Sequence, residues 1–145
     1  MEDYFAEFYE RDLLKLRDEV KNFRDEYNLW RTKEGVSNSA GTLVLHLLGN
    51  LNFGIGTQIA KNGYVRDREY EFSATDVPRE ELIAGINNLI EVVKSALTGI
   101  SREKLDEIYP QDKFGQKSTA YYLTLFHGHL NYHLGQINYL RRILE

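Results

Sequence analysis

Hydrophobic residues recur along this chain at alternating steps of four and three residues, the spacing of one face of an α-helix. The first series begins at Tyr9 and ends at Trp30, and charged residues occupy the other faces of the same segment. Similar series follow in three later parts of the chain. The sequence therefore predicts four long helices, at about residues 9–30, 39–61, 76–100 and 118–145.

Residues that favour helix ends lie at the borders of these segments. Ser37, Asn38 or Ser39 can cap the second helix, and Ser118 can cap the fourth. The glycine of "KNGY" can end the second helix, and Asp76 and Pro78 can open the third. We interpret the connection "VRDREYEFSATDVP" as a polar loop and "SREKLDEIYP" as a short turn.

The absence of any convincing strand pattern indicates an all-α protein, and four long helices favour a four-helix bundle. A chain of 145 residues fits one domain with a core of useful size, so we expect a single domain over residues 1–145. The connections on either side of the third helix are the longest, and either can carry a crossover.

The composition excludes several classes of protein. The net charge is −4, so the chain has no excess of positive charge for binding nucleic acid or an anionic membrane. No apolar run reaches the ~18–20 residues that span a bilayer. The acidic, aromatic N-terminus is unlike a signal peptide, which favours the cytoplasm. With no cysteine in the sequence, disulfides, thiolate ligands and a cysteine nucleophile are excluded.

Three of the four histidines lie in the stretch "HGHLNYHLGQ", residues 127–136. His129 and His133 are one helical turn apart and share a face, with Cβ atoms about 5–6 Å apart. Both lie on the face of the fourth helix that we predict to point inward, together with Tyr122, Phe126, Gln136, Leu140 and Ile143, and on the second helix His46 and Asn50 lie on the inward face. Two imidazoles at this spacing can reach one metal ion, and a third from a facing helix completes a three-nitrogen site.

Each of these residues also has a structural interpretation. His46 alone would be an ordinary hydrogen-bonded core histidine, and Asn50 and Gln136 can either support the site or join two helices. His127 lies about 200° around the helix from His129, so we expect it at the surface or between packed helices. Leu130 replaces the glutamate of the HExxH motif, which disfavours that metalloprotease mechanism.

Three motifs, "NSAGTLVLHLLGNL", "RDREYEF" and "HLNYHLGQINYL", give the chain a family resemblance over nearly its whole length. It resembles the DinB/YfiT-like superfamily of metal-dependent enzymes, and within it the DUF1572-like branch. The resemblance implies a four-helix bundle of up-down-down-up topology, often dimeric, with a divalent metal ion, commonly nickel or zinc, on His46, His129 and His133. Gly135 and Gln136 also match, whereas Leu134 stands where many relatives carry arginine.

The resemblance also implies a range of activities. Some members of the superfamily are transferases or isomerases that act with low-molecular-weight thiols, and many others have no known activity. Our first hypothesis is therefore a metal-dependent enzyme, a thiol-dependent S-transferase or a hydrolase of a small-molecule substrate. The alternative is a non-catalytic metal-binding or dimerisation module. Catalytic residues beyond the metal ligands are unknown at this stage.

Two further features bear on substrate and assembly. In "RDREYEF", Arg66 or Arg68 can bind a substrate carboxylate, but we favour ion pairs with Asp67, Glu69 or helix carboxylates that hold the loop. Apolar residues outside the main helical faces can form a self-complementary surface, and with the resemblance they predict a homodimer. These residues are Tyr4, Phe5, Phe8, Ile83 and Ile90.

Overall fold

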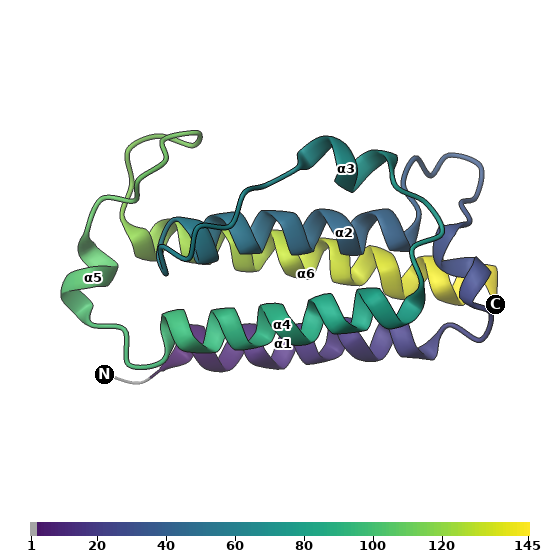
Figure 1. The fold of residues 1–145 in the computed structure, drawn as a ribbon, viewed down its shortest axis with the longest axis horizontal. Helices are drawn as coiled ribbons and strands as arrows, with labels where there is room; N and C mark the ends of the chain where they lie inside the picture. Colours follow the sequence, from purple (N-terminus) through teal and green to yellow (C-terminus); the bar gives the residue numbers. More distant parts are fainter. Residues whose placement is uncertain (1–2) are drawn as a thin grey trace.

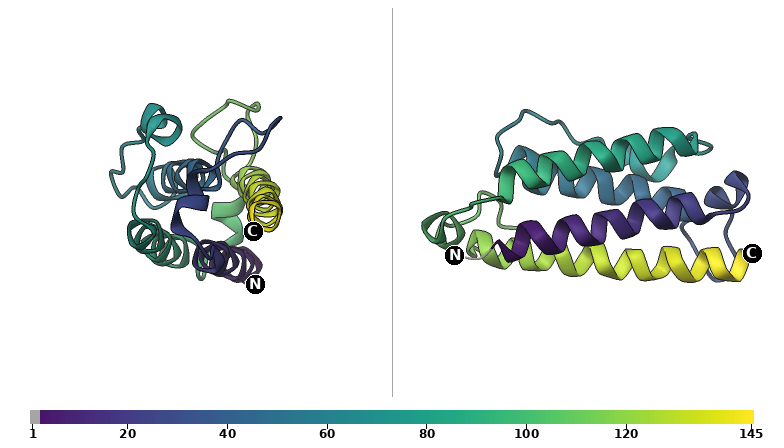
Figure 2. Two further views of the ribbon diagram at one scale, coloured as in Figure 1. Left: turned by 90° about the vertical axis from the view of Figure 1, so that its right-hand side faces the viewer. Right: turned by 90° about the horizontal axis from the view of Figure 1, so that it is seen from below.

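The helical periodicity of the sequence is confirmed in the computed structural model, which describes residues 3–145 (Figure 1). The four long helices are α1 (Tyr4–Asn22), α2 (Ala40–Leu51), α4 (Arg79–Leu97) and α6 (Thr119–Leu144). Helices α1 and α2 each pack against both α4 and α6, so the four surround one core (Figure 2). Within residues 3–145 the β-type pairing is limited to an isolated bridge between Ile108 and Ser118.

Shorter elements connect the long helices. They are the 3-10 helix η1 (Glu26–Trp30), the π-helical segment η2 (Asn52–Thr57), α3 (Arg68–Ser73) and α5 (Arg102–Asp106). The segment η2 continues directly from α2, and α3 lies over α2 (Figure 1). Among the described residues, none of the helices combines the length and apolar character needed to cross a bilayer.

The predicted caps explain where the second and fourth helices begin. The Ser39 side chain accepts a hydrogen bond from the Thr42 N–H, and Ser118 accepts one from the Tyr121 N–H. Each hydroxyl satisfies a backbone donor that the first helical turn leaves unpaired. Side-chain caps of the same kind also begin two short helices, in the segments predicted as a polar loop and a short turn. Asp67 caps α3, and Ser101 caps α5.

The first helix is shorter than predicted, because α1 ends at Asn22 rather than at Trp30. The side-chain carboxylate of Glu145 accepts hydrogen bonds from the backbone N–H groups of Arg24 and Asp25, at 2.8 to 3.1 Å. These donors would otherwise continue the α-helical ladder. The chain turns into η1 instead, which places Leu29 in the core with no exposed surface.

The buried face of α6 differs from the predicted one. Leu130, Leu134 and Ile137 lie in the core, whereas His129 and His133 are half-buried and Ile143 is exposed. The prediction that both histidines point into the middle of the four helices is therefore wrong in detail. They lie at the side of the core that α3 covers. Long aliphatic side chains bury more apolar area than imidazoles, which sets this rotation of the helix.

The surface predicted for a homodimer is only partly exposed. Tyr4 and Phe8 are exposed, Phe5 and Ile83 are half-buried, and Ile90 belongs to the core. Ile90 is therefore not available to a partner, and the homodimer stays a prediction.

A buried carboxylate joins α1 to α6. Asp12 has no exposed surface, and its oxygens lie 2.6 Å from Nε2 of His127 and 2.9 Å from Nδ2 of Asn131. Arg11 donates to the same carboxylate at 2.7 and 3.1 Å. Burial by itself raises the pKa of Asp12, but the hydrogen bonds from Arg11, Asn131 and His127 outweigh it and lower the pKa to about 2. His127 thus lies between packed helices.

We expect Asp12→Ala to lower the free energy of unfolding by about 1–3 kcal/mol, because it leaves the half-buried His127 of α6 without its acceptor and removes a buried side chain between α1 and α6. The matched control is Asp18→Ala on the exposed face of the same helix, which should change stability by less than ~0.5 kcal/mol. Urea denaturation measures both. Equal effects of the two substitutions would show that the Asp12 network does not stabilise the fold.

Candidate metal centre

Three imidazoles meet where α2 faces α6 under α3. Nε2 of His129 lies 3.2 Å from Nε2 of His46 and 3.0 Å from Nε2 of His133. The ligand atoms of all three residues fall within 4.8 Å of one another. The rings of His46 and His129 are nearly perpendicular, at 85°, so their edges rather than their faces converge. The structure thus brings together the three histidines that the sequence analysis selected.

The far side of two of the rings is held by hydrogen-bond acceptors. Nδ1 of His46 lies 3.1 Å from Oε1 of Glu71, and Nδ1 of His133 lies 2.7 Å from Oε1 of Gln136. A neutral imidazole that donates from Nδ1 carries a lone pair on Nε2. His46 and His133 therefore both direct an Nε2 lone pair at the third histidine.

The three histidines have too few protons to hydrogen-bond fully with one another, which suits them to a cation. A neutral His129 has one proton, so at most one of its two close Nε2 contacts can be a hydrogen bond. Its own Nδ1 is buried and has no partner among the described residues. Three imidazole nitrogens bound tetrahedrally at ~2.0–2.1 Å from one ion would lie about 3.3 Å apart, close to the distances observed here. The residues fit a divalent metal ion.

Burial and neighbouring charges keep His46 and His129 neutral. Burial lowers the pKa of His46, although Glu71 opposes this effect. The pKa of His129 falls to about 4, first because of burial and then through the neighbouring His133, His46, Arg66 and Lys113. His129 is therefore unprotonated at neutral pH, the form that binds a metal ion.

Glu71 positions His46 and is the functional residue that the sequence analysis missed. It is 3% exposed, and Arg66 forms a bidentate ion pair with it, with both N–O distances at 2.9 Å. We had expected the arginines of "RDREYEF" to pair with Asp67, Glu69 or a helix carboxylate, and Glu71 of α3 is the partner of Arg66. The available signal was an acidic residue between two aromatics, Tyr70 and Phe72.

Close packing between α2 and α3 depends on a glycine. A Cβ atom at Gly49 would overlap the carboxylate of Glu71. Gly49 lies on α2 three residues after His46, so the missing side chain leaves the space in which the carboxylate reaches the imidazole. Phe72 covers the other side of the His46 ring, with ring centroids 4.9 Å apart.

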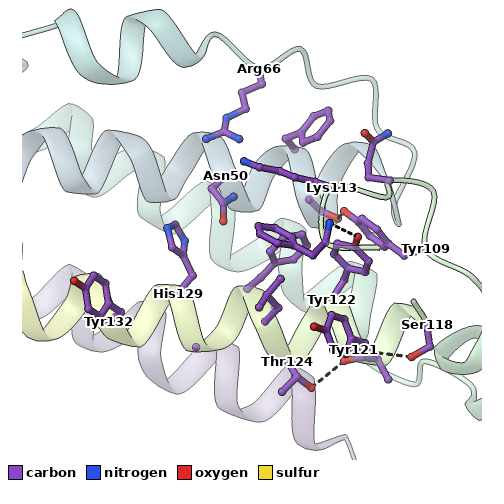
Figure 3. Close-up of a pocket in the computed structure, with 18 of the residues that line it drawn as sticks. Asn50, Arg66, Tyr109, Lys113, Ser118, Tyr121, Tyr122, Thr124, His129 and Tyr132 are labelled. Carbon is purple, nitrogen blue, oxygen red and sulfur yellow. Dashed lines mark hydrogen bonds between the residues drawn. The ribbon is translucent and has the colours of Figure 1, made fainter. Parts of the chain in front are cut away.

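A pocket of about 970 Å³ opens beside the triad (Figure 3). His46 and His129 contribute to its wall, together with Asn50, Arg66 and aromatic residues of α6. From the sequence, Asn50 either supports a ligand or joins two helices. Its Oδ1 atom is buried without a hydrogen-bond partner among residues 3–145 and points into the pocket (Figure 3). Gln136, in contrast, hydrogen-bonds to His133, three residues before it, rather than to His129, seven residues before it.

Comparison with known proteins identifies a family but no function. The model of a family described as "Protein of unknown function (DUF1572)" matches residues 6–145, nearly the whole chain. No curated protein matches the chain.

The lowered pKa of His129 predicts how the stability of the metal-free protein depends on pH. Between its ordinary value of 6.5 and about 4, the unfolded chain binds a proton that the folded chain excludes. The free energy of unfolding should therefore fall as the pH decreases through this range, by about 1–2 kcal/mol after allowance for partial exposure. Urea denaturation with a chelator, at several pH values, measures this. His129→Gln should flatten the slope, and an unchanged slope would contradict the assignment.

The contact between Gly49 and Glu71 predicts opposite effects of one substitution at two helical glycines. Gly49→Ala should lower the free energy of unfolding by about 1–3 kcal/mol, because the added methyl group displaces a buried carboxylate. Gly128→Ala on α6, where an added Cβ meets no atom within 4 Å, should raise it by about 0.5–1 kcal/mol. Thermal and urea denaturation test both, and a stabilising Gly49→Ala would refute the packing argument.

Proposed function

Because this chain belongs to the DUF1572 family, whose description names no activity, we propose its function from the geometry of the site. The protein is a metal-dependent enzyme that holds one divalent ion, nickel or zinc, on His46, His129 and His133. Its substrate is a small molecule bound in the adjoining pocket. The reaction classes that this site favours are transfer of a low-molecular-weight thiol to an electrophile and hydrolysis.

The observation that carries the proposal is the convergence of three Nε2 atoms that have too few protons to hydrogen-bond with one another. Two Nε2 lone pairs approach His129 at 3.0 and 3.2 Å, and Glu71 and Gln136 hold the opposite nitrogens of those two rings. Imidazoles packed this closely without enough donors cost free energy. A cation removes this cost, since it accepts all three lone pairs at once.

The protein residues around the triad prepare it in distinct ways. Glu71 fixes the orientation of His46, and the Arg66 guanidinium compensates the charge of that carboxylate. Gln136 fixes His133 in the same way from the next turn of α6. Such partners orient metal ligands and raise their basicity. When bound, a divalent ion supplies a nucleophile near neutral pH by lowering the pKa of a coordinated water or thiol.

The alternative is a non-catalytic module with a structural ion. Structural zinc sites are closed by four protein ligands, whereas catalytic sites have three and an open position. Among the described residues, the group of candidate ligands consists of the three histidines without a cysteine, aspartate or glutamate. The pocket of about 970 Å³ that ends at His46 and His129 also has the size of a small-molecule site. Both observations favour the enzyme.

The proposal includes membership of the DinB/YfiT-like superfamily, with its up-down-down-up four-helix bundle and a homodimeric assembly. Parallel neighbouring helices need a long connection, and the segment through α3 between α2 and α4 supplies one. Exposed Tyr4 and Phe8 are available to a second copy.

The proposal predicts one equivalent of nickel or zinc per chain in protein purified without chelator. His46→Ala, His129→Ala and His133→Ala should each weaken binding by more than about a hundredfold, since loss of a supporting hydrogen bond alone costs ~10–100-fold. His127→Ala should retain the metal, because His127 pairs with Asp12 on the other side of α6. Elemental analysis and titration calorimetry measure stoichiometry and affinity.

Circular dichroism should show that the alanine variants keep their helicity, because the apolar core does not involve the triad. A folded, metal-free wild type that binds neither ion at micromolar concentration would refute the proposal. Loss of metal from the His127 variant as severe as from the His129 variant would refute the ligand assignment.

A further inference from the structure

The pocket beside the triad has an apolar, aromatic wall. The side chains that form it are Tyr109, Phe114, Tyr121, Tyr122 and Phe126. The rings of Tyr109 and Tyr122 (Figure 3) stack with centroids 4.3 Å apart, and the ring centroid of Phe126 lies 5.9 Å from that of Tyr122. The hydroxyl groups of both tyrosines donate to backbone carbonyls, of Gly54 and Gly115 respectively. Both of these rings are almost completely buried and support the wall from behind, whereas the exposed rings of Phe114 and Tyr121 present flat apolar surface to a ligand.

The charged residues of the pocket all carry the same sign. Arg66, Arg68 and Lys113 line it, and none of its lining residues is an aspartate or glutamate. This is contrary to the chain as a whole, whose net charge is −4. The pocket is therefore a local positive region on an acidic protein, and such a region attracts anions.

Two of these three cations are not neutralised by the protein. Arg66 is paired with Glu71, whereas Arg68 and Lys113 each lie over an aromatic ring. The Arg68 guanidinium lies 4.9 Å from the ring centroid of Phe72, and Nζ of Lys113 lies 5.5 Å from that of Phe114. Neither forms an ion pair in the part of the chain that the structure describes.

These cations have a defined place relative to the triad. Arg68 packs on Phe72, which itself packs on the ring of His46. Lys113 comes from the segment between α5 and α6, and its side chain extends toward Asn50 in the view of Figure 3. The positive charges therefore lie toward the triad, and the aromatic wall extends from there toward the start of α6 (Figure 3).

Two further features indicate that a ligand enters here. Oδ1 of Asn50 is a buried acceptor without a donor, located between Arg66 and His129 in the view of Figure 3. Gly128 lines the pocket from the middle of α6, where a glycine costs about 0.5–1 kcal/mol relative to alanine. No neighbouring atom requires a glycine there, because an added Cβ would meet open space.

We propose that this pocket binds a small organic carboxylate with a flat apolar body, and that this class of molecule is the substrate. The carboxylate pairs with Arg68 and Lys113 beside the triad. The body stacks on the aromatic wall. The inference rests on the proposed function for the role of the ligand, whereas its binding is measured independently of the metal.

The test compares three naphthalene derivatives of similar size by titration calorimetry at neutral pH, on the full chain with and without one equivalent of zinc. They are 2-naphthoate, the neutral 2-naphthalenemethanol and the cationic 2-naphthylmethylamine. Naphthoate should bind about tenfold more tightly than the alcohol, and the amine more weakly than both. Equal affinity for the anion and the alcohol, or no binding of naphthoate, would overturn the proposal.

Matched variants locate the site. Lys113→Gln and Arg68→Gln should each weaken naphthoate binding by about three- to tenfold and leave the alcohol unaffected. Lys117→Gln is the control, because Lys117 belongs to the same segment and lies 5.5 Å from the Tyr121 ring but does not line the pocket. Gly128→Leu should abolish binding of both compounds, and Gly135→Leu, elsewhere on α6, should not.

An unchanged preference for the anion in both charge variants would overturn the proposal. The two hypotheses fail separately. Anion-selective binding by a protein that takes up no metal would refute the metal site alone, and metal uptake without anion selectivity would refute the ligand class alone.

Discussion

A carboxylate that is almost completely buried must be matched by donors, and the site depends on how Glu71 meets this requirement. It accepts two hydrogen bonds from Arg66 and one from His46, and it occupies the space that Gly49 leaves open on α2. One side chain thereby attaches α3 to α2 and orients an imidazole of the triad. The same contacts place Arg66 and Arg68 at the pocket, because both precede Glu71 by only a few residues.

A second buried carboxylate acts on the opposite side of α6. Asp12 accepts from His127 and Asn131, so it holds the rotation of α6 against α1 that burial of the aliphatic side chains favours. His129 and His133 lie on the other side of the same helix, and that rotation directs them toward α2. The stretch "HGHLNYHLGQ" therefore supplies two networks at once. In the network around Asp12, the carboxylate is matched by donors of the protein. In the histidine triad, the imidazole nitrogens have more lone pairs than protons to share among them.

The pocket results from a local change of helix geometry as well as from side chains. The chain passes from α2 into the π-helical segment η2, a type of distortion that is frequent at functional sites. Within η2, the backbone carbonyl of Gly54 accepts from Tyr109, and a Cβ at this glycine would collide with the ring of Phe126. The segment η2 thus contacts Tyr109 and Phe126 of the aromatic wall, while α2 supplies His46. The aromatic wall and the candidate metal ligands thus meet along one helix and its extension.

The sequence by itself determined the helical class, the four long segments, the caps at Ser39 and Ser118, and the three histidines that converge. These features follow from spacings of three and four residues and from hydrogen bonds within one turn, which are local and repeat along the chain. Only the tertiary structure decided the end of α1, the rotation of α6, and the contacts of Glu71 and His127. Their partners lie far away in the sequence: 25 residues separate His46 from Glu71, and 115 separate Asp12 from His127. No periodic pattern encodes such pairs, because each depends on which polar groups burial leaves without water and which neighbour then lies within reach.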